Sequence, residues 1–62
     1  MLSENLKKAR LENNRTQKSV ADAVGVSQVA IQYFEAGTKV PSLPVMVALA
    51  ATLNKSIDEL VK

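Results

Sequence analysis

The chain lacks the residues from which most catalytic and metal sites are built. None of its 62 residues is Cys or His, so thiol nucleophiles, disulfides, imidazole bases and the usual transition-metal ligands are excluded. It has only two glycines and therefore no glycine-rich phosphate-binding loop. Four serines stand just ahead of expected helices and are explained as N-caps: Ser3, Ser27, Ser42 and Ser56. We therefore expect no enzymatic activity, no metal, no cofactor and no small-molecule substrate.

Long apolar runs are absent as well. No stretch reaches the ~18 consecutive apolar residues of a membrane-spanning helix. The N-terminal MLSENLKKAR is typical of an amphipathic helix rather than of a secretion signal. Hydrophobic residues make up 47% of the chain, enough for one core, and a chain this short forms one domain, residues 1–62. We expect a soluble, cytosolic protein without membrane contact.

The positive charge is small but unevenly distributed. The net charge is +2, and residues 1–40 hold six Lys or Arg against four Asp or Glu, whereas residues 41–62 hold two of each. The surplus lies in the half of the chain that carries the helix pair described next. This distribution suits a polyanionic partner.

Residues 16–37 are predicted to form two short helices joined by a tight turn. Thr16 and Ser27 are good N-caps, each followed by a helical pattern. Gly25 and Gly37 stand where a helix ends in a left-handed residue. Ala21 is expected at the crossing of the helices, because two helices this close need small contact residues. The positions expected to face inward are Val20, Ala21, Val24, Ala30, Ile31 and Phe34.

The rest of the chain is predicted to add three helices. A first helix runs from a cap at Ser3 to about Asn13. A helix over 43–53 is apolar nearly all round, so it should be central to the core or bury a second face in another subunit. Ser56 and Glu59 form a capping box for a short last helix. With no strand pattern, the predicted fold is all-α, with five short helices around one core.

The outward face of the second helix of the pair carries no charge. Gln28, Val29, Gln32 and Tyr33 follow an i, i+1, i+4, i+5 spacing, which is one helical face. A helix fits the DNA major groove, where Gln can pair with adenine and an aliphatic side chain can pack on a thymine methyl group. An ordinary polar surface would instead carry Lys or Glu. We interpret these four residues as base-contacting.

At these positions the sequence resembles a known family. TQ-x2-VA-x2-VGVS-x2-AI-x2-FE-x-G, followed by PSL…LA…L and S-x-DEL, is similar to the lambda-repressor-like helix-turn-helix domain of phage repressors and Cro proteins, the Xre-like family. The resemblance covers essentially the whole chain and implies a prokaryotic or phage-encoded protein. The matching positions include the small residue, the turn glycine, an inward apolar residue, the Glu-x-Gly pair and a loop proline: Ala21, Gly25, Ile31, Glu35, Gly37 and Pro41.

The resemblance implies roles for individual residues. It assigns base contacts to Gln28, Val29, Gln32 and Tyr33, with Val29 on thymine methyl groups. It also implies a structural ion pair between Arg10 and Glu35. A phosphate contact is implied for Gln17, and the loop 38–42 should lie on the DNA backbone. The full set expected at phosphates is Gln17, Lys18, Thr38, Lys39, Ser42 and Arg15.

Arg15 departs from the family, in which an apolar residue is usual at this position. Either its aliphatic stem is buried and the guanidinium extends into solvent, or the side chain gives up contact with the core and reaches toward a phosphate. Which base Tyr33 approaches, or whether it meets a phosphate, is also open. Both a complete Cro-like protein and the head of a longer repressor fit the sequence.

Two functions of different class follow. The first is a transcriptional regulator, expected to act as a repressor, that binds near-palindromic double-stranded DNA as a homodimer. Its pairing surface would comprise Val40, the exposed side of the 43–53 helix, Ile57, Leu60 and Val61. The alternative is an Xre-like protein-interaction module, a coactivator or antitoxin, favoured by the small net charge and the very apolar 43–53 helix.

Overall fold

Five α-helices and no strand make up the computed structural model, which describes residues 1–62. In chain order the helices are α1 (Leu2–Glu12), α2 (Gln17–Val24), α3 (Gln28–Ala36), α4 (Leu43–Leu53) and α5 (Ile57–Val61). The all-α fold predicted from the sequence is confirmed, and α4 has the predicted bounds. None of the five helices combines the length and the apolar character that crossing a lipid bilayer requires.

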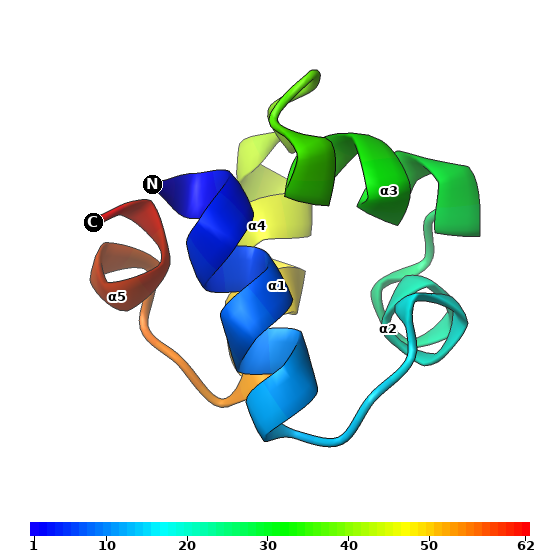
Figure 1. Ribbon diagram of the computed structural model, residues 1–62, viewed down its shortest axis with the longest axis horizontal. Helices are drawn as coiled ribbons and strands as arrows, with labels where there is room; N and C mark the ends of the chain where they lie inside the picture. Colours follow the sequence, from blue (N-terminus) through cyan, green and yellow to red (C-terminus); the bar gives the residue numbers. More distant parts are fainter.

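The helices enclose the core from several sides. α1 lies in front of α4, the pair α2 and α3 lies to one side, and α5 lies to the other (Figure 1). α2 packs on α3 and α4, whereas α1 packs on α3 and α5. The first and last residues meet, since the Met1 ammonium donates to the carbonyl of Lys62 at 3.3 Å. The two chain ends therefore lie side by side.

One cluster of 11 buried hydrophobic residues forms the core, and α4 contributes more of them than any other helix. The cluster comprises Leu6 and Ala9 of α1, Val20 and Ala21 of α2, Ile31 and Phe34 of α3, Met46, Leu49, Ala50 and Leu53 of α4, and Leu60 of α5. The central place predicted for the apolar helix is thus confirmed. Burial of these side chains, at roughly 1.5–3 kcal/mol for each large one, is the main force that holds the helices together.

Two of the four serine caps differ from the prediction. α1 begins at Leu2, so Ser3 lies inside the helix, and the carbonyl of Met1 accepts the first helical hydrogen bond from Asn5 at 3.0 Å. Ser3 instead packs near Gly37, where its hydroxyl would lie 3.4 Å from an added Cβ. Ser42 precedes α4 as predicted, but its side chain makes no capping hydrogen bond.

Candidate nucleic-acid interface

Local hydrogen bonds define both helices of the pair. The Thr16 hydroxyl accepts from the Ser19 amide at 3.0 Å, and the Ser27 hydroxyl accepts from the Ala30 amide at 3.1 Å. Gly25 ends α2 with a φ of 85°, a left-handed conformation that costs a residue with a side chain about 1–2 kcal/mol. The predicted N-caps and turn glycine are therefore confirmed, and they hold α3 at a fixed angle to α2.

The inward positions of the pair are buried as the sequence predicted. Val20 and Ala21 of α2 are each 1% exposed, and Ile31 of α3 is 2% exposed. Val24 and Ala30 are only partly buried and line the margin of the core. Because Ala21 is so completely enclosed, the crossing of α2 and α3 has no room for a larger side chain.

The opposite face of α3 is open to solvent. Gln28, Val29, Gln32 and Tyr33 are all exposed, Val29 by 49% and Tyr33 by 43%. Among the α3 side chains, Glu35 alone forms hydrogen bonds within the chain. The two amide side chains therefore keep all their donors and acceptors for a partner, and nothing in the fold requires them.

The predicted ion pair between Arg10 and Glu35 is present and largely buried. Nε of Arg10 donates to Oε2 of Glu35 at 2.7 Å and Nη2 to Oε1 at 3.2 Å, with only 11% and 7% of the side chains exposed. Nη1 of Arg10 donates to the carbonyl of Arg15 at 2.9 Å. The guanidinium thus ties α3 to α1 and to the segment that enters α2.

Gln17 joins the same network, which the sequence did not indicate. Its Nε2 donates to Oε1 of Glu35 at 3.2 Å. The first residue of α2 is therefore bound to the second-last residue of α3. No local pattern announces this contact, because it depends on the angle at which the two helices cross. The amide retains one N–H for another acceptor.

The other residues expected at phosphates differ in how strongly their side chains are engaged by contacts within the chain. Lys18 lies 3.7 Å from Asp22 in an exposed pair. Arg15 folds along α2, where its Nε donates to the Ser19 hydroxyl at 2.9 Å. Thr38 donates its hydroxyl to the carbonyl of Tyr33 at 3.3 Å, and Ser42 is exposed. Lys39 has no carboxylate partner, and its ammonium lies 4.9 Å from the centroid of the Tyr33 ring.

The prediction of the pairing surface is wrong for one residue, which is buried. Leu60 is 1% exposed and belongs to the core of its own chain, so it has no surface to offer a partner. Val40 and Val61 are exposed by 77% and 50%, and Ile57 is partly buried. The exposed side of α4 adds Leu43 and Val47, which are 69% and 52% exposed and stand one turn apart.

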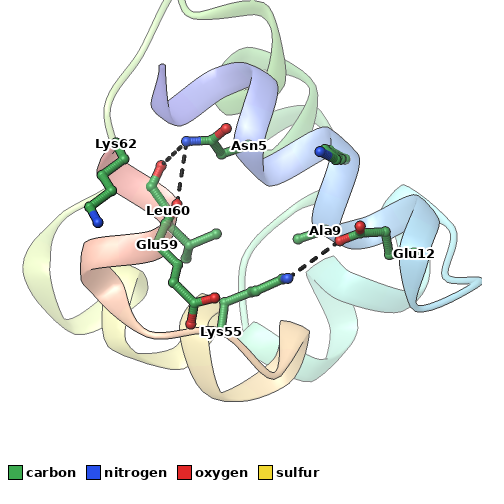
Figure 2. Close-up of a pocket in the computed structure, with 8 residues that line it drawn as sticks. Asn5, Ala9, Glu12, Lys55, Glu59, Leu60 and Lys62 are labelled. Atoms are coloured by element: carbon green, nitrogen blue, oxygen red, sulfur yellow. Dashed lines mark hydrogen bonds and ion pairs between the residues drawn. The ribbon is translucent and has the colours of Figure 1, made fainter.

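A polar cavity of about 260 Å³ lies on the other side of the molecule, between α1 and α5 (Figure 2). Asn5 spans it by donating to the carbonyls of Glu59 and Leu60 at 3.4 and 3.0 Å, and Lys55 pairs with Glu12 at 3.5 Å. These contacts fasten α5 to the body of the protein. The cavity is lined by both lysines and glutamates, so it offers no single charge to a ligand.

The capping box that starts α5 is also present. The Ser56 hydroxyl accepts from the Glu59 amide at 3.1 Å, and the Ser56 amide donates to the Glu59 carboxylate at 2.9 Å. These bonds, with a smaller contribution from Lys55 and Lys62, lower the pKa of Glu59 from its ordinary value of 4.5. The box fixes the first turn of a helix that is only five residues long.

Known proteins are similar to this chain in sequence. The sequence pattern of a helix-turn-helix family matches residues 6–60. The HTH-type transcriptional regulator YqaE of Bacillus subtilis is 36% identical over 62 residues, which are 100% of this chain and 53% of that protein. The cryptic phage CTXphi transcriptional repressor RstR of Vibrio cholerae is 36% identical over 59 residues, 95% of this chain and 53% of RstR. The chain thus spans about half the length of these relatives.

A solved structure agrees with the fold. The restriction-modification controller protein C.AhdI of Aeromonas hydrophila superimposes with a TM-score of 0.89 over 95% of this chain and 89% of that one, at 24% sequence identity. At this identity the likeness concerns the fold. The family pattern and the two relatives carry the assignment: as its resemblance to phage repressors and Cro proteins indicated, this chain belongs to the helix-turn-helix family of transcription regulators.

Proposed function

We propose that the protein is a sequence-specific transcriptional repressor that reads the major groove of a near-palindromic DNA site as a homodimer. The observation that carries the proposal is the exposed, uncharged face of α3. Gln28 and Gln32 stand about 6 Å apart along the helix axis, at ~1.5 Å per residue, and are free of intramolecular bonds. Such amides suit adenine edges, and Val29 between them suits a thymine methyl group.

Phosphate contacts would hold α3 in the groove. These contacts would come from Gln17 and Lys18 at the start of α2, from Arg15 just before it, and from the loop after α3, with Thr38, Lys39 and Ser42. Arg10 and Glu35 remain structural. The relative RstR is a transcriptional repressor by name, which supports the same direction of regulation here.

Pairing of two copies would provide two half-sites. Recognition helices of such dimers lie ~34 Å apart, one turn of DNA. Each copy measures 24 × 23 × 19 Å, so two copies side by side are wide enough for this separation. Val40, Leu43 and Val47 are all more than half exposed and are the apolar residues best suited to the contact, to which α5 would add Val61 and the partly buried Ile57.

Selection of bound sites from random duplex DNA tests the proposal, since it returns the preferred sequence, its symmetry and the half-site spacing. Gln28→Ala is expected to weaken binding by ~1–3 kcal/mol and to relax preference at one base position. An unchanged base preference in that variant would show that α3 does not dock as proposed.

A protein-interaction module is the second candidate, and the exposed apolar side of α4 favours it. In that case the chain would select no DNA sequence, and its affinity for duplexes would be weak and non-specific. A steep fall of affinity with salt, together with a preferred site well above non-specific binding, would exclude this alternative.

A further inference from the structure

Tyr33 is the point at which the loop after α3 is attached to the helix. Its carbonyl accepts from the Thr38 amide at 3.1 Å, from the Thr38 hydroxyl at 3.3 Å and from the Lys39 amide at 3.5 Å. The backbone of the loop is therefore fastened to the same residue whose side chain faces outward. A movement of Tyr33 would carry Thr38 and Lys39 with it.

The side chain of Tyr33 makes a second attachment. The ammonium of Lys39 lies 4.9 Å from the ring centroid, within the ~6 Å that defines a cation–π contact. The ion pairs of this chain involve Arg10, Lys18 and Lys55, and Lys39 is in none of them. A neutral ring, unlike a carboxylate, holds the lysine without cancelling its charge.

The position of Tyr33 along α3 separates it from the amides. It is the sixth of nine residues in the helix, about 7.5 Å beyond Gln28 at ~1.5 Å per residue. Recognition helices reach base edges mainly with their N-terminal residues. Tyr33 thus lies in the second half of the helix, toward the end where the chain turns into the loop.

We propose that Tyr33 is a positioning residue that holds the Lys39 ammonium against a DNA phosphate, and that it does not read a base. The inference rests on the proposed DNA binding. The ring occupies only one side of the ammonium, which therefore keeps N–H donors for a phosphate oxygen. A lysine already held over a ring also loses less side-chain freedom when it meets a phosphate.

Three variants test the role: Tyr33→Phe, which keeps the ring, Tyr33→Leu, which removes it, and Lys39→Ala. Affinity is measured by fluorescence anisotropy on the selected duplex and on duplexes with single base changes, over a range of salt. Tyr33→Leu should weaken binding about two- to fivefold, the size of one exposed cation–π contact, and equally on every duplex. Tyr33→Phe should bind like the native chain.

Coupling to Lys39 is the decisive readout. Lys39→Ala should lower the slope of log affinity against log salt by about 1, and adding Tyr33→Leu to it should have no further effect. The idea is overturned by additive effects of the two changes, by no loss in Tyr33→Leu, by an equal loss in Tyr33→Phe, or by altered preference at one base pair.

A measurement without DNA separates this inference from the proposed function. In NMR spectra the ring should shift the Lys39 ε-methylene protons upfield in the native chain and in Tyr33→Phe, but not in Tyr33→Leu. If the shift is present and no duplex is selected, the proposed function fails and the positioning role fails with it. If a duplex is selected and the shift is absent, only the positioning role is overturned.

Discussion

Replacing Glu35 by Ala should damage the fold far more than its place on α3 suggests. The carboxylate accepts from Arg10 twice and from Gln17 once. Its removal leaves Arg10, whose side chain is only 11% exposed, with its Nε and Nη2 unpaired. Nη1 keeps its bond to the carbonyl of Arg15. The substitution therefore destabilises the fold mainly because the positive charge of Arg10 stays poorly solvated and without its carboxylate partner.

The expected loss is about 3 kcal/mol, the lower end of the range for breaking a buried ion pair, because Arg10 retains one bond. A chain of this length has a total stability of about 3–9 kcal/mol. For a small domain, 3 kcal/mol corresponds to a fall in the melting temperature of about 12–24 °C. Glu35→Ala should consequently retain only about 0–6 kcal/mol of stability.

Urea unfolding followed by circular dichroism measures the change. Asp22→Ala is the matched control, since it breaks the Lys18 pair, whose side chains are 73% and 69% exposed, and it should cost less than ~1 kcal/mol. The double change Arg10→Met with Glu35→Leu should recover most of the stability, because no buried charge remains. A loss in Glu35→Ala no larger than in Asp22→Ala would refute the reasoning.

Further substitutions at three positions address other parts of the fold. Ala21→Leu should lower the free energy of unfolding by ~1–3 kcal/mol through overpacking of the α2–α3 crossing, a loss that denaturant titration detects. Gly25→Ala should cost ~1–2 kcal/mol, because its φ is +85° even though nothing lies within 4 Å of an added Cβ, and Gly25→Asn should cost less in the same assay. The lowered pKa of Glu59 means that the stability it contributes is present above its unfolded value of 4.5 and is lost as pH falls through the lower folded value. Acid titrations of stability should therefore be flatter in Glu59→Gln than in the native chain.

Local signals were sufficient for most of the helix boundaries. Thr16, Ser27 and Gly25 each act on neighbours within a few residues, so their roles can be seen in the sequence. The outward face of α3 was also predictable, because helical spacing alone separates Gln28 and Gln32 from the buried positions.

The features that the sequence did not predict at Ser3, Leu60 and Gln17 involve contacts between distant parts of the chain. Ser3 lies inside α1 because Met1, whose ammonium meets the carbonyl of Lys62, occupies the cap position. Leu60 is buried because Asn5 holds the end of α5 against α1. The bond from Gln17 to Glu35 likewise spans 18 positions. Spacing along one helix cannot reveal which of its apolar or polar side chains will contact another helix.

The freedom of the outward α3 side chains has a consequence for how this protein can change over evolutionary time. Gln28, Val29 and Gln32 are exposed, whereas Ile31 and Phe34 on the same helix are buried. Mutations at the exposed positions should be close to neutral for folding, so they can accumulate without compensating changes elsewhere. A library randomised at these three positions should yield folded proteins in most clones, and new DNA preferences could be selected directly from it.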